Sequence, residues 1–216
     1  MDLGYFANLT ESQGQDLFQG VGTLQMIPQR VQILRGVATG LMEEWEGSAR
    51  NLVETAGRHG KKIAGLLATT IPIGFADRWV VEGIGELRLD KLAHLAASFM
   101  AAGMGWHAAG FSGYELFPMY PDYMLPRVFR HTGIMKYAPD LAARVDARQL
   151  IAAGSPEELA LRWATVYAGD RLLTALQARG NAVTAPALDY RLWYEAVLGP
   201  EAATFGEHHR TVTLKY

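Results

Sequence analysis

The 216-residue sequence contains no cysteine, which excludes disulfide bonds, thiolate metal sites and cysteine nucleophiles. It also lacks an apolar run of membrane-spanning length. The amino-terminal segment, MDLGYFANLTES, has neither a basic region nor an apolar core that would direct secretion. These absences predict a cytoplasmic protein with no membrane partner.

An excess of charge of either sign is also missing. Lys and Arg together number 20 and Asp and Glu 22, so the formal net charge at pH 7 is -2. Proteins that bind nucleic acid backbones present a positive surface, and this balance therefore argues against a nucleic-acid partner. Half of the residues are hydrophobic and 19% are charged, which is the composition of an ordinary globular protein.

What the sequence does contain is a succession of helix signals. Thr10 and Gln13 have the spacing of a capping box, and Pro28 suits the first turn of a helix that continues to Gly47. The clearest start is SPEE at 155–158, which combines a cap, a first-turn proline and a capping-box acid. That helix should run to about residue 180 with one apolar face, formed by Leu159, Trp163, Val166, Leu173 and Leu176. Shorter helices are expected after Ser48, around 63–71, at 125–131, from Pro139 and at 185–198.

Residues 79–89, WVVEGIGELRL, interrupt this pattern with two β-prone runs around a glycine-rich turn, which predicts a small hairpin. Asp90 should then cap a helix whose apolar residues are Leu92, Leu95, Phe99 and Trp106. No repeat, low-complexity segment or linker divides the chain. The prediction is a mostly α protein, with one helical domain over residues 1–216 and a β-hairpin near 79–89.

Three acids stand out from the surrounding pattern. Asp122 lies between Tyr120 and Tyr123 at a predicted helix start, Asp170 lies on an apolar helix face, and Asp189 has large apolar and aromatic neighbours. Each also has a structural explanation. Asp122 can cap a helix, Asp170 can sit in water at the edge of the stripe, and Asp189 can be a first-turn helix acid. Taken singly, each acid fits its structural role better than a catalytic one.

No motif for nucleotide or metal chemistry is present. The sequence has no P-loop, no GxGxxG between a strand and a helix, and no GxSxG, while GIGE at 83–86 falls in the predicted hairpin. His208 and His209 are adjacent, so their side chains point in different directions and suit chelation of one ion poorly. No metal site is predicted. Arg210 beside them suits contact with a phosphate or carboxylate.

The order of segments along the chain is more specific than any single residue. The chain resembles the queuosine salvage proteins, the queuosine 5′-phosphate N-glycosylase/hydrolase family. The similarity runs through YFANLTESQGQDLFQG, IPQRVQILRGVATGLMEEWEGSARNLVETA, LDKLAHLAASF, MYPDYMLPRVFRHTGIMKY, LDYRLWYEAV and HHRTVTLKY. These segments span nearly the whole chain in family order.

The resemblance implies a fold like that of the helical DNA glycosylases and hydrolysis of the N-glycosidic bond of queuosine 5′-monophosphate. The products would be ribose 5-phosphate and queuine, which is salvaged for tRNA modification. The family's Phe-Ala-Asp-Tyr-Arg segment implies Asp122 as the catalytic carboxylate, with Tyr120 and Tyr123 as aromatic residues that flank the substrate. Asp189 matches an acid expected to contact the substrate.

The remaining predicted contacts follow from the same resemblance. Asp189 would bind the polar edge or the diol of queuine, with Trp193 or Tyr190 packed on the ring. Lys91 and Arg210 are the candidates for the 5′-phosphate, because it requires cationic or N–H donors. No metal or redox cofactor is implied, the substrate is a small-molecule nucleotide, and the oligomeric state is not indicated.

The chain departs from the family pattern at several points. Met124 and Leu92 replace arginines, and Tyr194 replaces the second acid of an Asp-Tyr-Tyr-Leu-Trp-Asp segment. A Phe/Trp-rich segment that precedes the matched region in family members has no counterpart in this sequence. The missing segment and the lost second acid favour an alternative, a non-catalytic helical module that binds a nucleotide or a protein. Asp122 and Asp189 together oppose it, because binding has no special need for both.

The implied reaction sets requirements on the site. N-glycoside cleavage passes through an oxocarbenium-like sugar, which a fixed carboxylate near the anomeric carbon stabilises. Asp122 at a helix start would be helped to stay ionised. Asp122 and Asp189 are therefore expected to face one cavity lined by aromatic rings. A glycosylase acting on DNA would require a basic stripe, which the chain lacks.

Overall fold

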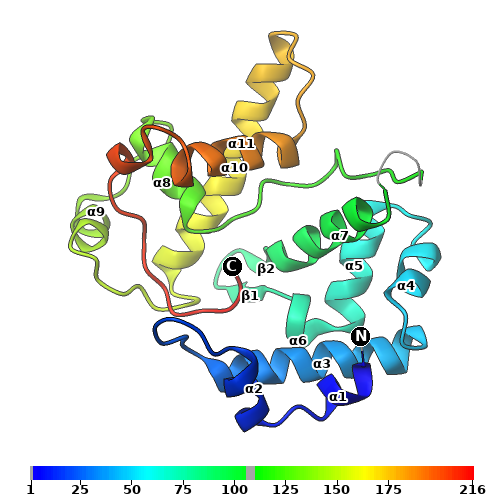
Figure 1. The fold of residues 1–216 in the computed structure, drawn as a ribbon. Helices are drawn as coiled ribbons and strands as arrows, with labels where there is room; N and C mark the ends of the chain where they lie inside the picture. The colour runs from blue at the N-terminus through cyan, green and yellow to red at the C-terminus, as the bar shows by residue number, and fades with distance from the viewer. Residues whose placement is uncertain (1, 106–109) are drawn as a thin grey trace. The chain divides into compact units, whose positions relative to one another are not determined.

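A computed structural model describes residues 2–105 and 110–216 of the chain (Figure 1). The predicted mostly helical fold with one small hairpin is confirmed. Trp106, expected on the apolar face of the helix after Asp90, lies outside the described residues. Over the two described ranges, no helix has both the length and the apolar character needed to cross a bilayer.

The chain divides into two compact units, each made of two segments. Unit 1 comprises the described residues of Met1–Asp77 and Leu92–Ser112, and unit 2 comprises Arg78–Lys91 and Gly113–Tyr216. The polypeptide therefore passes from one unit to the other more than once, and neither unit is a continuous stretch of sequence. A single domain over residues 1–216 stays a prediction.

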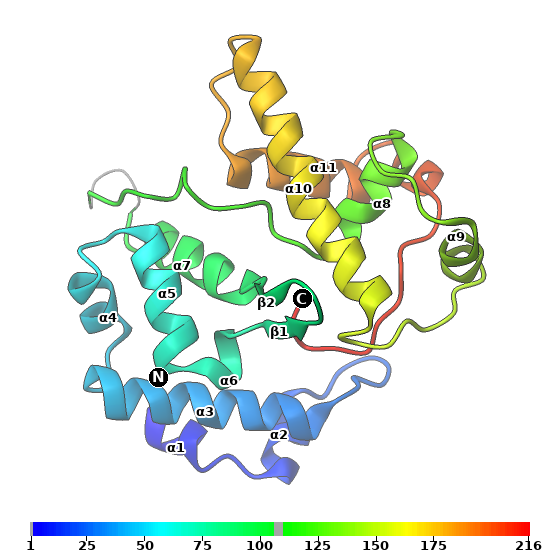
Figure 2. The same ribbon diagram turned by 180° about the vertical axis from the view of Figure 1, so that it is seen from behind.

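Unit 1 is built around the long helix α3 (Ile27–Trp45). Both views show α1 (Leu3–Ala7) and α2 (Glu11–Leu17) on one side of α3, with α6 (Pro72–Phe75) on the other (Figure 1, Figure 2). The unit also contains α4, α5 and most of α7, which span Ala49–Thr55, Gly60–Thr70 and Lys91–Gly103. The capping box of Thr10 and Gln13 at the start of α2 is confirmed, since both reciprocal hydrogen bonds form.

Helix α7 buries small residues instead of large ones. Ala93, Ala97 and Ala101 are fully buried and recur every four residues, so they form one face of the helix. Phe99, which the sequence pattern placed on the apolar face, is 70% exposed. That part of the prediction was wrong, because alanines allow a close approach that a stripe of bulky residues does not.

Unit 2 contains the hairpin and four α-helices. Strands β1 (Arg78–Val81) and β2 (Gly85–Arg88) pair antiparallel, which confirms the hairpin predicted at 79–89. Its inner residues Leu87 and Leu89 pack against Leu159. The helices are α8 (Met124–His131), α9 (Pro139–Asp146), α10 (Pro156–Ala178) and α11 (Ala185–Val197), followed by the short 3-10 helix η1 (Ala202–Phe205).

The core of unit 2 joins α8, α10 and α11, which pack on one another (Figure 1). Its buried members come from α8, from α11 and from the irregular segment before α8, and are Met119, Leu125, Phe129, Ala185 and Leu188. Partly buried leucines of α10 complete this core. The segment that ends at Asp122 is therefore anchored in the core by Met119.

Helix α10 begins where the sequence predicted, since the Ser155 hydroxyl accepts the N–H of Glu158 at 3.2 Å. Its buried face is different from the predicted one. Trp163 is 51% exposed, although Leu159 is buried as expected. The buried positions also include a charged pair and two small residues at helical spacing, namely Glu158, Arg162, Thr165 and Gly169. The apolar-face prediction was wrong for Trp163 because a pair of opposite charges occupies the inner side of the first turns.

Gly169 allows α10 to approach Met119 closely. A Cβ atom at this position would lie well inside van der Waals contact with the buried Met119 side chain. We expect Gly169→Ala to destabilise the protein by about 1–3 kcal/mol, because overpacking forces core side chains out of their preferred rotamers.

Gly65→Ala in α5 is the matched control, since a Cβ atom there meets nothing within 4 Å. It should stabilise the protein by about 0.5–1 kcal/mol through helix propensity. Denaturant unfolding measures both variants. Equal stability of the two would contradict the close packing at Gly169.

Candidate functional site

The segment Tyr120–Asp122, which leads into α8, is buried and held at each of its three residues. A charged side chain from a different part of unit 2 contacts each of them. These side chains are Asp189 of α11, Arg162 of α10 and Lys91, the first residue of α7.

Asp122 uses its two carboxylate oxygens differently. Oδ1 accepts the N–H groups of Met124 at 2.7 Å and Leu125 at 3.0 Å, at the start of α8. Oδ2 lies 3.4 Å from Nζ of Lys91. The predicted helix-start position is confirmed, and the same carboxylate faces a cation. Two N–H donors and an ammonium group therefore contact this side chain.

Lys91 is buried together with its partner, at 9% exposure against 6% for Asp122. A buried ammonium group is stable when it is paired with a carboxylate. Because it has three N–H donors, it can bind Asp122 and a substrate oxygen at once. The contact with a 5′-phosphate stays a prediction.

Asp189 reaches the same segment from α11. It lies four residues after Ala185, where the helix starts, so its interpretation as a first-turn acid was wrong. Its Oδ2 accepts the N–H of Tyr120 at 2.6 Å. Burial raises the pKa of Asp189 to about 7; the Tyr120 N–H opposes this rise, the negative charge of Asp122 adds to it, and Lys91 opposes it. Asp189 can therefore gain or lose a proton near neutral pH.

Arg162 holds the middle of the segment and is fully buried. Its Nε donates to the carbonyl of Pro121 at 3.2 Å, and an Nη lies 3.4 Å from Oε1 of Glu158. Oε2 of Glu158 accepts the N–H of Gly154 at 3.1 Å. Such a pair persists in the interior only when hydrogen bonds compensate for lost hydration. Arg162 was not among the site residues predicted from the sequence, although its i,i+4 spacing from Glu158 was a usable signal.

The carboxyl-terminal segment covers Arg162. The ring of Tyr216 lies 4.5 Å from the Arg162 guanidinium carbon, and its hydroxyl is 3.3 Å from Nε2 of His209. Burial, with nearby positive groups, lowers the pKa of His209 to about 4, so this imidazole is neutral at pH 7. Arg210 points to Glu207, at 3.6 Å. Its proposed contact with phosphate stays a prediction.

Aromatic rings flank the segment on two sides. The ring of Tyr120 lies 6.4 Å from that of Phe117, and the ring of Tyr123 lies 4.9 Å from the imidazole of His208. Burial lowers the pKa of His208, and the negative charge of Asp122 acts against that shift. Substrate contacts of Tyr120 and Tyr123 stay predictions, and so does the shared aromatic cavity for the two carboxylates.

The other predicted aromatic contacts lie along α11. Tyr190 is 66% exposed and stacks on Trp193 at 6.4 Å. Trp193 follows Asp189 by four residues, which places it on the same helix face. Tyr194 is 37% exposed, so the acid that it replaces would lie on the outer side of α11. Substrate contacts of Tyr190 and Trp193 stay predictions.

Unit 2 is thus a helical unit with a buried cluster of one lysine and two carboxylates, Lys91, Asp122 and Asp189. The cluster surrounds the hydrogen-bonded backbone segment 120–122. Over the described part of the chain, no three His, Cys, Asp or Glu side chains gather as metal ligands would. The cluster is suited to reactions that develop positive charge and need a proton near neutral pH.

Comparison with known proteins supplies the family. A family model described as "Queuosine salvage protein" matches residues 1–216, and the chain belongs to this family. A protein of Sphaerobacter thermophilus named queuosine 5′-phosphate N-glycosylase/hydrolase is 32% identical over 216 residues, which is 100% of this chain and 66% of the relative.

Two eukaryotic proteins of the same name also match. The one from Schizosaccharomyces pombe is 25% identical over 80% of this chain and 49% of its own length. The one from Dictyostelium discoideum is 25% identical over 87% of this chain and 58% of its own length. The chain therefore spans about half to two thirds of the length of these curated relatives.

The Arg162–Glu158 pair generates a stability prediction. Arg162→Met should destabilise the protein by about 3–5 kcal/mol, because it leaves the Glu158 carboxylate buried without its countercharge. The double variant Arg162→Met/Glu158→Leu should recover part of this loss. Urea unfolding with Arg171→Met, a change at an exposed arginine of the same helix, provides the baseline. A double variant less stable than Arg162→Met would show that the charge pair is not the source of the effect.

Proposed function

We propose that the protein hydrolyses the N-glycosidic bond of queuosine 5′-monophosphate and releases queuine and ribose 5-phosphate. The observation that carries the proposal is the Lys91–Asp122 ion pair beside buried Asp189, within the region that the family model matches. The names of the three relatives support the reaction. The substrate is a small nucleotide, and the location is the cytoplasm.

Asp122 is the carboxylate that stabilises the sugar. As the C1′–N bond breaks, positive charge develops on C1′ and the ring oxygen of the ribose. Oδ1 is fixed by Met124 and Leu125, so Oδ2, the oxygen that also pairs with Lys91, is the one that interacts with this charge. A fixed negative charge in a water-poor site stabilises a cationic transition state without reorganisation.

Asp189 serves the leaving base. With a pKa raised to about 7, it carries a proton in part of the molecules at neutral pH and can donate it to the base. The bonding electrons of C1′–N pass to the base, the proton neutralises it, and water then adds its oxygen to C1′. The proton released by that water restores Asp189.

The position of Tyr194 weakens the alternative of a non-catalytic module. That alternative rested partly on the replacement of the family's second acid by Tyr194. Because Tyr194 lies on the outer side of α11, that replacement leaves Asp122 and Asp189 in place. No observation on unit 2 favours the module over the enzyme.

Removal of the Asp122 charge tests the proposal. Asn at position 122 can still accept the N–H groups of Met124 and Leu125, so Asp122→Asn should fold. The rate of base release should fall by at least about 10³-fold, because a charge that stabilises the transition state is lost. Single-turnover assays with queuosine 5′-monophosphate and mass detection of free queuine measure this rate.

Glu201→Gln, which removes one exposed acid in the same unit, is the control and should keep normal turnover. Substrate binding by Asp122→Asn should persist, since the lost interaction acts mainly in the transition state. A folded Asp122→Asn protein with full activity would remove Asp122 from the mechanism.

The raised pKa of Asp189 predicts a pH dependence of stability. Folded Asp189 keeps its proton up to about pH 7, whereas the unfolded side chain loses it near pH 4. The folded state therefore binds more protons between these values, and its stability contribution, complete below about pH 4, is lost as pH rises to about 7. Asp189→Asn should remove this decline, and its free energy of unfolding should exceed that of the wild type above pH 7.

The same group should limit activity on the alkaline side. If Asp189 donates the proton, kcat/KM of the wild type should fall as pH rises through about 7. The Asp189→Asn variant should have a much lower kcat/KM, and this kcat/KM should not fall as pH rises through about 7. A wild-type profile that rises through this range would exclude Asp189 as the proton donor.

A further inference from the structure

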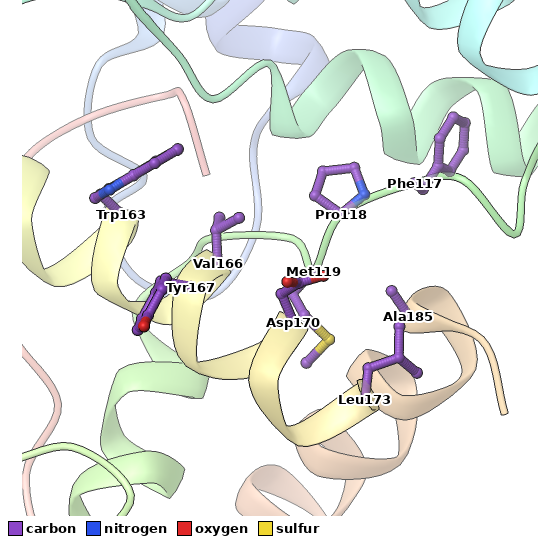
Figure 3. Close-up of a pocket in the computed structure, with 9 residues that line it drawn as sticks. All are labelled: Phe117, Pro118, Met119, Trp163, Val166, Tyr167, Asp170, Leu173 and Ala185. Carbon is purple, nitrogen blue, oxygen red and sulfur yellow. The ribbon is translucent and has the colours of Figure 1, made fainter. Parts of the chain in front are cut away.

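A cavity of about 190 Å³ lies in unit 2 next to the segment that carries Asp122 (Figure 3). Its walls come from residues 117–119, from the middle of α10 and from the first residue of α11. Complete ligand pockets usually have about 300–1,000 Å³, so this one suits a single substituent of a ligand and not a whole nucleotide.

Two separate segments connect the cavity with the buried carboxylates. Met119, a wall residue, precedes Tyr120, whose N–H is bound by Asp189. Ala185, another wall residue, precedes Asp189 by four positions on α11. Side chains at this spacing lie about 5–6 Å apart at Cβ. One wall residue of the cavity is therefore one helical turn from Asp189.

The chemistry of the walls is aromatic with one negative charge. Trp163 and Tyr167 are exposed and lie one turn apart on α10. Asp170 lies three residues after Tyr167 on the same helix. Figure 3 shows Trp163 and Tyr167 projecting from α10, with Pro118 on the opposite wall. Among the described residues that line the cavity, Asp170 is the charged one.

Asp170 was singled out in the sequence because it interrupts an apolar face. The structure places it at the exposed edge of that face, as its structural explanation anticipated, and also on the wall of the cavity. A carboxylate beside aromatic faces recognises an organic cation, through an ion pair and cation–π attraction. The aromatic and apolar walls favour a cation that is attached to a carbon ring whose face can pack on them.

We propose that this cavity is a specificity subsite for the cationic substituent of the deazapurine ring of queuine, in which an aminomethyl group carries the cyclopentene-diol ring. The secondary amine pairs with Asp170, and the cyclopentene ring packs on Trp163. This inference rests on the proposed function and assigns the part of the base that the enzyme uses to distinguish its substrate from other purine-like nucleotides.

Three nucleotides that differ only in this substituent test the proposal. They are queuosine 5′-monophosphate, 7-aminomethyl-7-deazaguanosine 5′-monophosphate and 7-deazaguanosine 5′-monophosphate. Asp170→Asn should raise KM about 3- to 5-fold for the two that carry an amine, as expected for a partly exposed ion pair. The same variant should leave KM for 7-deazaguanosine 5′-monophosphate nearly unchanged. It should also leave kcat nearly unchanged for all three nucleotides.

Trp163→Leu should raise KM for queuosine 5′-monophosphate more than for the aminomethyl nucleotide, which lacks the cyclopentene ring. Glu201→Gln is the charge-matched control and should change none of these values. Equal effects of Asp170→Asn on all three nucleotides, or no effect, would overturn the subsite while wild-type turnover still upholds the reaction.

Direct binding separates the two proposals. If the wild type releases no base from any nucleotide, the proposed function fails. Calorimetric titration with free queuine and with 7-deazaguanine then decides the subsite: weaker queuine binding by Asp170→Asn, with unchanged 7-deazaguanine binding, upholds it. Unchanged affinity for both overturns it.

Discussion

The hydrogen bond from the Arg162 guanidinium to the carbonyl of Pro121 is the contact on which the candidate site depends. It fixes the residue before Asp122 from inside the protein, where water cannot compete. A guanidinium has several donors in one plane, so the same group also pairs with Glu158. Tyr216 closes the remaining face of Arg162. An ammonium group at this position could not make all of these contacts in one fixed geometry.

The two buried carboxylates differ because their surroundings differ. Asp122 accepts hydrogen bonds from two backbone N–H groups and pairs with a lysine. Asp189 accepts one backbone N–H, and the negative charge of Asp122 raises its pKa further. Two like charges in a dry site favour protonation of one of them. Burial of Asp189 is the main cause of its raised pKa, and the negative charge of Asp122 adds to it.

Local signals made most of the helix positions predictable. The caps at Thr10 and Ser155, with the hairpin turn at 82–84, act within a few residues of sequence. The buried alanines of α7 and the Glu158–Arg162 face of α10 were missed, because hydrophobic periodicity weighs large apolar residues and ignores charges that neutralise each other. Asp122 and Asp189 stood out from the local pattern and were assigned to the site through the family resemblance, while the raised pKa of Asp189 follows from tertiary contacts that the sequence does not show.

The two oxygens of Asp122 make different contacts, and this difference has a thermodynamic consequence. Because Oδ1 is bound by two N–H groups at the start of α8, the carboxylate loses its rotational freedom when the protein folds. That entropy is lost once, during folding, and not again with each substrate molecule. The ordering of the catalytic group is thereby part of the folding free energy of α8, and any change that frays the first turn of this helix appears as a less favourable activation entropy.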